Sequence, residues 1–349
     1  MTDDRSPEGE AEAGRGAAVS VLEAEPGPGS RQVATRRAIE RASGAGRGDS
    51  FFKGVALVAG AMVLVILGLI TVSTAWQAWP AFQQEGISFV TSADWNPNTG
   101  QFGALAFIYG TVLVSIIALA MAVPVSLGIA LFTTQVAHRR LRTPIGFVVD
   151  LLAAIPSVVY GLWGVLVLVP AIEPVYQAVS DSIGTWPIFS WFFGPPVNGK
   201  SFMTAGIILA FMITPIITSL STEVIKTVPS QQREAALALG ATRWEMIRGS
   251  ILPWSRGGIT GAVMLGLGRA MGETIAAALV IGSSTQITTH VFASGDAMAA
   301  YIANQFGEAN GVFRSALIGL GLVLFIVTII VNISAQRIVG RFDRKLAKG

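Results

Sequence analysis

Six long runs of apolar residues leave few folds open to this chain. They lie at residues 54–76, 105–134, 145–171, 203–225, 257–282 and 313–336. Each is long enough to cross the hydrocarbon core of a bilayer, which takes about 20 helical residues. A segment in lipid must satisfy its own backbone hydrogen bonds, so the runs are predicted to be helices. Only 13% of the residues are charged, against about 25% in soluble domains. The sequence predicts an all-α membrane protein with six transmembrane helices.

Two of these runs contain a proline. Pro124 lies in the second run and Pro156 in the third. Because proline has no backbone N–H and clashes with the preceding turn, both residues are expected to kink or interrupt their helices.

Lysine and arginine are distributed unevenly along the chain. Eight precede the first run, three lie in 135–144, five in 226–256 and five after residue 336, so 21 of the 24 fall on one side of a six-helix arrangement. The excess of positive charge marks the cytoplasmic side. Both termini and segment 226–256 are therefore predicted to be cytoplasmic. With five or seven spans, these lysines and arginines would fall on both sides of the membrane.

The two ends of the chain differ from its middle. Residues 1–50 have few large apolar side chains and are expected to form a disordered cytoplasmic tail. The transmembrane domain is expected over 51–340, with 226–256 as a cytoplasmic loop, and 341–349 as a basic cytoplasmic tail. No signal peptide is expected. The chain has no cysteine, and no metal site or cofactor is expected. A net charge of +3 is too small to indicate nucleic-acid binding.

The spacing from Gly194 to Ser201 fits G-x-x-x-x-G-K-S, the phosphate-binding loop of nucleotide hydrolases. We reject this interpretation because such a loop holds phosphate with successive backbone N–H groups, and Pro195 and Pro196 have none. The surrounding tryptophans and phenylalanines indicate a loop at the membrane surface, on the external side.

The segment between the fourth and fifth runs is polar and amphipathic. Pro229 and Ser230 fit the start of a short helix, with Ser230 able to cap it. The alanines and leucines after Glu234 continue this helix up to Gly240, which permits a turn with positive φ.

A second short helix is predicted over 242–248. It presents Trp244, Ile247 and Ile251 along one side, and Pro253 is expected to end it. So close to the membrane, this helix–turn–helix is not expected to bind DNA. It either lies on the membrane surface or docks in a groove of a cytoplasmic partner.

The fifth run carries two charges. Arg269 lies about 18 Å beyond Gly257 at 1.5 Å per residue, near the middle of the membrane. A charge there costs at least about 2.5–3.5 kcal/mol, so it must face protein or water. Glu273 follows at i+4, on the same helix face, where the two can form an ion pair. Because arginine before glutamate is the less favourable order, Glu273 can instead meet another helix.

Two interpretations of this pair remain open. Either it locks two helices together, or Arg269 lines the path of an anion, since a guanidinium donates two parallel hydrogen bonds to an oxyanion. Thr274 adds a neutral donor. Glycines spaced four residues apart let another backbone approach, and we expect their face to contact a neighbouring helix, such as one of a second membrane subunit. They are Gly257, Gly261, Gly268 and Gly272.

Segment 226–256 resembles the EAA loop of ABC importer permeases, which is Glu-Ala-Ala, three residues, Gly, then nine residues before Ile-x-Leu-Pro. Ser250 stands at the isoleucine position here. The resemblance implies coupling helices that sit in a cleft of a separate ATPase subunit. The residues that carry it are Glu234, Ala235, Ala236, Gly240, Leu252 and Pro253.

Two further segments resemble phosphate importer permeases of the PstC type. Residues 267–274 are similar to the family's GRAxGET segment, and residues 155–161 to its IPSxxYG segment in the third span. The resemblance covers about residues 50–345 and implies the type I ABC importer permease fold. It makes Arg269 and Glu273 the family's intramembrane charged pair. Ser157 and Tyr160 would line the substrate path with them or only shape a proline-broken helix.

The resemblance implies a transport subunit of the bacterial inner membrane without a nucleotide site of its own. The expected partners are a second permease of the PstA type, two ATP-binding subunits of the PstB type and an external phosphate-binding protein of the PstS type. Asp296 and Glu308 are expected in external loops, where they could contact the binding protein. A permease for sulfate, molybdate or phosphonate, an ATPase-independent anion channel or carrier, and a membrane scaffold remain alternatives.

Overall fold

The computed structural model describes residues 47–346 except 183, 185, 187–188 and 197. The chain divides into two compact units, residues 1–67 and 68–349. Helix α2 (Arg47–Glu85) accounts for the described part of the first unit and opens the second. Residues 1–46 of the tail that was expected to be disordered lie outside the described residues. Residues 47–50 form the start of α2.

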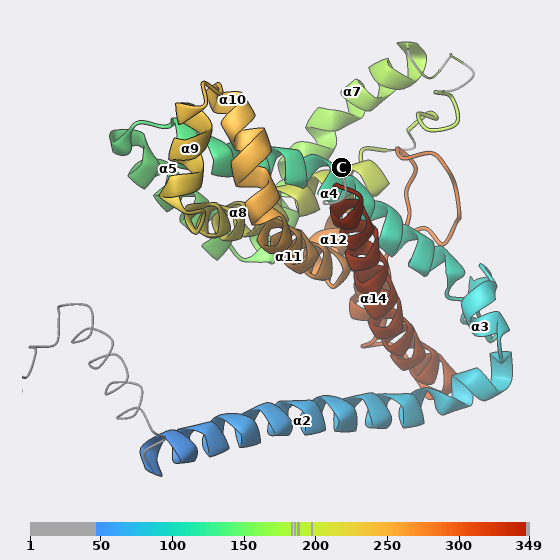
Figure 1. Cartoon of the computed structure of the whole chain (residues 1–349). Coiled ribbons are helices and arrows are strands. Elements are labelled where there is room, and N and C mark those ends of the chain that lie inside the picture. Colours follow the sequence, from blue (N-terminus) through green and yellow to red (C-terminus); the bar gives the residue numbers. More distant parts are fainter. Residues whose placement is uncertain (1–46, 183, 185, 187–188, 197, 347–349) are drawn as a thin grey trace, which may run out of the picture. The chain divides into compact units, whose positions relative to one another are not determined.

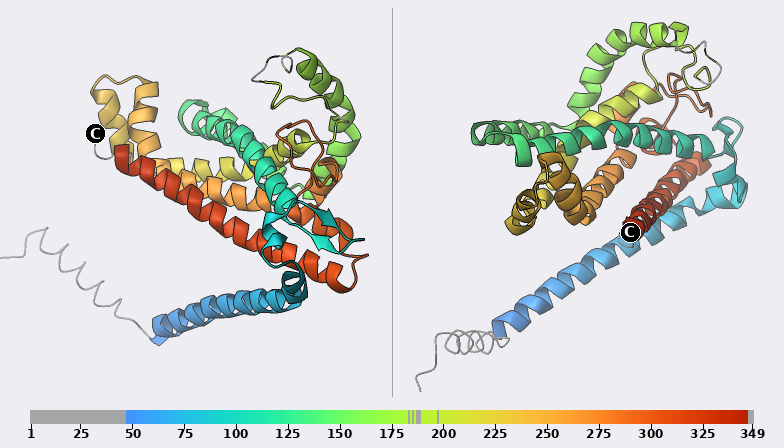
Figure 2. Two further views of the ribbon diagram at one scale, coloured as in Figure 1. Left: turned by 90° about the vertical axis from the view of Figure 1, so that its right-hand side faces the viewer. Right: turned by 45° about the horizontal axis from the view of Figure 1, so that its top comes forward.

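Helices make up most of the described chain, with one small antiparallel hairpin before α4 (Figures 1 and 2). Of three π-helical turns, labelled η, η1 extends α4, whereas η2 and η3 each join two α-helices end to end. After α2 the elements are α3 (Ser88–Thr91), β1 (Trp95–Asn96), β2 (Gln101–Phe102), α4 (Leu105–Leu131), η1 (Phe132–Val136), α5 (Arg139–Ala154), α6 (Ser157–Trp163), η2 (Gly164–Leu168), α7 (Val169–Ser182), α8 (Phe202–Lys226), α9 (Ser230–Ala238), α10 (Arg243–Met246), η3 (Ile247–Ile251), α11 (Leu252–Met271), α12 (Ile275–Val280), α13 (Met298–Gln305) and α14 (Gly311–Leu346).

Five helical stretches of the described chain are long and apolar enough to cross a membrane. They correspond to the first, second, third, fourth and sixth predicted runs. The fifth run is not among them because its helix begins in the polar segment and ends at Met271. The five are Ser50–Glu85, Leu105–Val136, Ser157–Ser182, Phe202–Lys226 and Gly311–Arg337.

The two prolines behave differently from each other. Pro156 separates α5 from α6, so the predicted interruption there is confirmed, and the third span begins at Ser157 rather than at residue 145. Pro124 lies inside α4, which continues through it. The interruption at Pro156 leaves α5 as a separate amphipathic helix that begins among the arginines of 139–142.

Helices α4 and α8 form the centre of the second unit, and α11 and α12 pack against α8 (Figure 1). Glycines let these helices approach closely, because a Cβ at Gly206 of α8 would meet Ile117 of α4, and one at Gly266 of α11 would meet Ile217 of α8. The same core includes the buried side chains of Val114, Phe202, Ile208 and Ile213. This packing fixes the position of α11, which carries Arg269.

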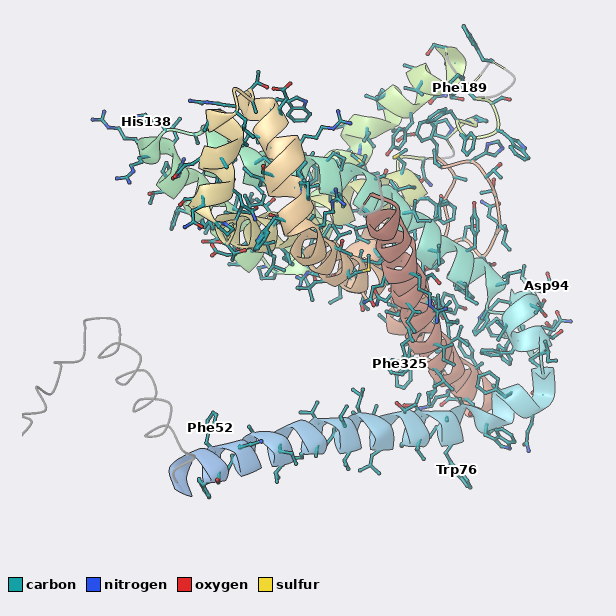
Figure 3. The ribbon with its side chains drawn as sticks, in the orientation of Figure 1. Phe52, Trp76, Asp94, His138, Phe189 and Phe325 are labelled. Carbon is teal, nitrogen blue, oxygen red and sulfur yellow. The ribbon has the colours of Figure 1, made fainter. Side chains whose placement is uncertain are left out.

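The ends of α4 mark two opposite ends of this unit. Asp94 lies before α4 begins, near α3 and the hairpin, whereas His138 lies beyond η1, where α5 begins (Figure 3). At the His138 end, Ala130 of α4 and Ile225 of α8 share an apolar cluster with Ile247 of η3. The two arginine-rich segments, 135–144 and 226–256, therefore lie at the same end of the bundle, as their charge predicted.

Candidate functional site

The predicted intramembrane charge, Arg269, lies in the last turn of α11. A cation at this end of a helix interacts favourably with the helix dipole. The side chain is exposed, and it has neither a hydrogen bond nor an ion pair with any described residue. The guanidinium lies close enough to the Tyr160 hydroxyl to interact with it electrostatically. Arg269 is thus left open to a partner outside the described chain.

The continuous helix predicted over 257–282 is wrong. Helix α11 ends at Met271, and α12 begins only at Ile275. Glu273 therefore does not lie one helical turn beyond Arg269, and no ion pair joins them in the described structure. Instead, the Glu273 Oε1 atom accepts the backbone N–H of Ala276 at 3.2 Å and caps the start of α12. Interrupted backbone at membrane depth is tolerated where it is buried in protein or lines a watery cavity.

Of the hydroxyl groups predicted to line a path, one lies within this break and two lie on α6. Thr274 Oγ1 donates to the Gly272 carbonyl at 3.2 Å, within the break. Ser157 is the first residue of α6. Tyr160 donates its hydroxyl to the Leu152 carbonyl at 2.9 Å, across the interruption made by Pro156. Tyr160 therefore braces the proline-broken helix and also lies beside Arg269.

Close packing of α6 on α12 brings these residues together. A Cβ at Gly161 would lie 2.8 Å from the Ala276 Cα and 2.9 Å from the Leu279 side chain. Glycine is therefore required at this position for α6 to lie against α12. The contact joins the Tyr160 end of α6 to the first turn of α12, next to Glu273 and Thr274.

The glycine face of α11 has open space beside it. A Cβ at Gly257, Gly261 or Gly268 would meet nothing within 4 Å among the described residues. Leu265, on the same face, is also exposed. Arg269 lies along this stripe. The face that was predicted from the glycine spacing to contact a neighbouring helix therefore also carries the guanidinium.

The second candidate feature is the elbow, defined here as residues 229–253, in which α9 and α10 lie side by side (Figures 1 and 2). Gly240 has a φ of 84°, which confirms the predicted turn. Its N–H donates to the Leu237 carbonyl at 3.0 Å, and the Ala241 N–H donates to Ala236 at 3.2 Å. These bonds form the Schellman ending of a helix, which places glycine at the left-handed position.

A capping box starts the second helix of the elbow. The Thr242 N–H donates to Glu245 Oε2 at 2.8 Å, and the Glu245 N–H donates to Thr242 Oγ1 at 3.3 Å. The hydrogen bonds from Thr242 hold the pKa of Glu245 below its usual value. The T-x-x-E spacing in the sequence is the signal of this cap.

The helix that begins at Arg243 does not end at Pro253. It continues through η3 into α11, where Pro253 lies in the first turn. The π-helical turn η3 ends at Ile251, so Pro253 lies just after a point where the regular α-helical hydrogen-bond pattern is already interrupted. The chain is therefore helical without a break from Arg243 to Met271.

The elbow presents one buried and one exposed set of apolar residues. Ile247 and Ile251 pack against the ends of α4 and α8, with Ala236 and Leu252 at the edge of the cluster. Trp244 was predicted on the same side but is 63% exposed. Two other apolar side chains of the elbow are exposed as well, Leu237 and Leu239.

The remaining residues of the EAA resemblance lie on the outside of the elbow. Glu234 and Ala235 are exposed on α9. Ala235, Ala236 and Pro253 also line a shallow groove of 580 Å³ between α9 and the start of α11. The elbow is thus anchored on one side and open to a partner on the other.

Asp296 is buried rather than available to an external partner, which corrects that expectation. It is 3% exposed, and its carboxylate accepts the N–H of the next residue at 2.8 Å. Burial raises the pKa of this carboxyl group to about 7. The whole stretch 291–300 is buried, and its Ala293 carbonyl accepts the Phe202 N–H at 3.1 Å at the start of α8. No local pattern of residues around Asp296 predicts this burial.

The segment that fits a phosphate-binding loop has a structural role. Ser201 caps α8 by accepting the Thr204 N–H at 3.2 Å, and it is fully buried. This placement agrees with the rejection of a nucleotide site.

Comparison with known proteins assigns a family. Residues 122–348 match the family described as binding-protein-dependent transport system inner membrane component. The chain is 47% identical over 300 residues to the phosphate transport system permease protein PstC of Xylella fastidiosa, covering 86% of this chain and 93% of the relative. It is 40% identical over 299 residues to PstC 2 of Mycobacterium tuberculosis, covering 84% and 92%.

Solved structures show the same fold. A bacterial alginate ABC transporter, crystallised with a periplasmic protein that carries an alginate pentasaccharide, has a TM-score of 0.56 at 19% identity, over 84% of this chain and 97% of that chain. A second crystal structure of an alginate-importing bacterial ABC transporter has a TM-score of 0.53 at 20% identity, over 88% and 99%. At these identities the likeness concerns the fold alone. The protein is thus a multi-pass component of the bacterial inner membrane and belongs to the PstC-type permeases of binding-protein-dependent transport systems.

Proposed function

We propose that this chain is the permease subunit through which inorganic phosphate crosses the inner membrane, in an ABC importer driven by ATP hydrolysis in a partner chain. The observation that carries the proposal is Arg269, a guanidinium without a partner among the described residues, at a helix break and beside Tyr160. A charge at membrane depth is stabilised only by protein, water or an opposite charge. Relatives named as phosphate permeases support phosphate as the anion.

The path would lie between α11 and a second permease subunit of the PstA type. The open glycine face of α11 lets the backbone of another helix approach closely. Arg269 would then face the interface between the two subunits. The hydroxyl groups of Ser157, Tyr160 and Thr274 would offer neutral hydrogen-bonding partners to the anion, and Glu273 would hold the start of α12 beside it.

Six crossings with both termini in the cytoplasm account best for the charge distribution, with α11 and α12 together supplying the fifth. The elbow would then face the cytoplasm and dock on one of two ATP-binding subunits of the PstB type. Its exposed residues Leu239 and Trp244 suit an apolar cleft on such a partner. A PstS-type binding protein would deliver phosphate to the opposite end of the bundle.

The unbroken helix from Arg243 to Met271 suggests how ATP hydrolysis would reach the path. At 1.5 Å per residue it extends about 40 Å, from the elbow to the helix break. Closure of the ATPase dimer would move the elbow, and this helix would carry the motion to Arg269. Alternating access then requires that ATP and the binding protein favour different states of the bundle.

Uptake of radiolabelled phosphate by proteoliposomes tests the proposal. The complex would be purified with its ATP-binding subunits and given binding protein outside and ATP inside. We expect ATP-dependent uptake that unlabelled phosphate inhibits and that excess sulfate, molybdate or phosphonate leaves unchanged. Uptake without ATP would favour a channel or carrier, and competition by another oxyanion would change the substrate.

A further inference from the structure

Two neighbouring cavities in the second unit share part of their lining, and together they are named the groove. The first, of 270 Å³, is lined by polar and charged side chains of η1, α5, α8 and α9, together with a few apolar ones. The second, of 340 Å³, is lined almost entirely by apolar side chains of α4, α5, α6 and α8. Ile129, Val149 and Thr218 line both cavities. The groove therefore has a charged end and an apolar end.

The change from charged to apolar lining can be followed along α8. Along α8, Glu223 and Lys226 line the charged cavity, whereas Ile207 and Phe211 line the apolar one, and Thr218 lies at the junction. From residue 207 to the junction α8 rises about 16 Å, which is about half of the hydrocarbon thickness of a bilayer. The apolar end thus has the length of one leaflet.

The charged end holds two guanidinium groups whose orientation is fixed by backbone carbonyls. Arg142 Nε donates to the Ala137 carbonyl at 3.0 Å, and Arg233 Nη2 donates to the Val228 carbonyl at 2.7 Å. The Nε atom of Arg233 is buried and has no acceptor among the described residues. The other N–H groups of both side chains are likewise without an acceptor in the described structure.

The carboxylates of the charged end do not neutralise these arginines. Glu223 pairs with Lys226 at 2.7 Å. Asp150 also lines the cavity but forms no ion pair with a described residue. Two guanidinium groups therefore face one unpaired carboxylate, and this end of the groove favours an anion.

We propose that the groove binds an anionic phospholipid, with its headgroup phosphate at Arg142 and Arg233 and one acyl chain along α8. Arginine donates parallel hydrogen bonds to phosphate oxygens. Basic pockets between helices at the cytoplasmic side suit anionic headgroups, and the proposed orientation places the charged end in that leaflet. The apolar end would be a poor environment for a hydrated phosphate ion, because it offers few groups to replace the lost water.

The site has a consequence for coupling. Arg233 belongs to α9, whereas Arg142 belongs to α5. A phosphate held by both side chains ties the elbow to the span bundle. Lipid binding itself is independent of whether the transported anion is phosphate, so the two proposals are tested separately.

Native mass spectrometry of the full-length chain, purified with its partners, tests the assignment with added phosphatidylglycerol or phosphatidylcholine. We expect phosphatidylglycerol to be retained, and the double variant Arg142→Gln, Arg233→Gln to weaken its retention about tenfold, since it removes charged hydrogen bonds to phosphate. The matched double variant Arg139→Gln, Arg140→Gln changes the same charge on exposed residues outside the groove and leaves retention unchanged.

A second pair of variants tests the apolar end without changing charge. Val125→Trp narrows the apolar cavity from α4 and is expected to weaken phosphatidylglycerol retention. Ile116→Trp, on an exposed site of α4 outside the groove, is expected to leave it unchanged. The proposal is overturned if phosphatidylcholine is retained equally, if millimolar inorganic phosphate displaces the lipid, or if each control variant acts like its partner.

Discussion

At the scale of single residues, Glu273 is the clearest case in which the charge and the hydrogen-bonding role of a side chain can be separated. Its Oε1 atom accepts the Ala276 N–H, and it forms no ion pair with a described residue. Glu273→Gln keeps an oxygen acceptor, whereas Glu273→Ala removes it. We expect the alanine variant to lose about 1 kcal/mol of stability, as for other helix caps, and the glutamine variant to lose much less.

Thermal unfolding in detergent measures this difference. Equal destabilisation by Glu273→Gln and Glu273→Ala would contradict the capping role and indicate that the carboxylate charge matters, for example through Arg269 in another state. The circular dichroism signal of each variant before heating serves as the control for folding.

Asp296 makes stability depend on pH. Burial raises the pKa of its carboxyl group to about 7, above the usual value of 3.8. Between these two values the folded chain keeps a proton that the unfolded chain has lost, so stability falls as pH rises through this window and levels off above it. Asp296→Asn removes this dependence of stability on pH but keeps a side-chain oxygen that can accept the Ala297 N–H.

We therefore expect Asp296→Asn to raise the thermal midpoint clearly at pH 8, and to raise it least near pH 4. Melting curves of the two proteins across this range provide the measurement. A gain that is the same at every pH would show that the pKa of this carboxyl group is not raised in the folded protein.

At the scale of elements, one large apolar side chain of the elbow is much more exposed than the others. Leu239 is 89% exposed beside the Gly240 turn. We expect Leu239→Asp to abolish co-purification of the ATP-binding subunit, because a charge would have to enter its apolar cleft. Ile87→Asp is the matched control, since Ile87 is 82% exposed at the other end of the bundle.

Pull-down of the ATP-binding subunit by each variant gives the result directly. Normal recovery with Leu239→Asp would mean that this side of the elbow does not bind the partner. Loss of recovery with both variants would point to a general defect in assembly.

The sequence predicted those elements that are determined locally. A span needs about 20 apolar residues, and five of the six predicted runs correspond to helices long and apolar enough to cross a membrane. The turn at Gly240 followed from the backbone freedom of glycine. The break at 272–274 could not be predicted. Its residues include no proline, which is the residue type used to predict interruptions in the other apolar runs. Pro253 was interpreted as a helix end, although the helix continues through it directly after the π-helical turn η3.

Features that depend on packing between distant segments were also missed. Asp296 is buried because its backbone carbonyl lies against Gly110 of α4, where a side chain would collide with it. The groove between α5, α8 and α9 likewise depends on the placement of Arg142 and Arg233, which are far apart in the sequence. Neither feature leaves a periodic pattern that a single sequence can reveal.

At the scale of the whole molecule, the number of crossings is open to direct test because the chain has no cysteine. Single cysteines at exposed positions would each react with a membrane-impermeant maleimide from one side only. We expect Asn98→Cys and Thr285→Cys to react in intact spheroplasts. Gln231→Cys and His138→Cys should react only after permeabilisation. Reaction of Thr285→Cys and Gln231→Cys from the same side would mean that α11 and α12 do not cross the membrane together.

In our proposal, Arg269 lines the transport path and is not only a structural charge. The most direct measurement is ATP-driven uptake of radiolabelled phosphate by proteoliposomes that contain the complex with Arg269→Gln, compared with the unchanged complex at equal subunit content. Glutamine keeps much of the side chain's length and hydrogen bonding but removes its charge. We expect uptake to fall at least about tenfold, as for loss of a charged hydrogen bond, while the complex still assembles. Normal phosphate uptake by a fully assembled Arg269→Gln complex would contradict the account.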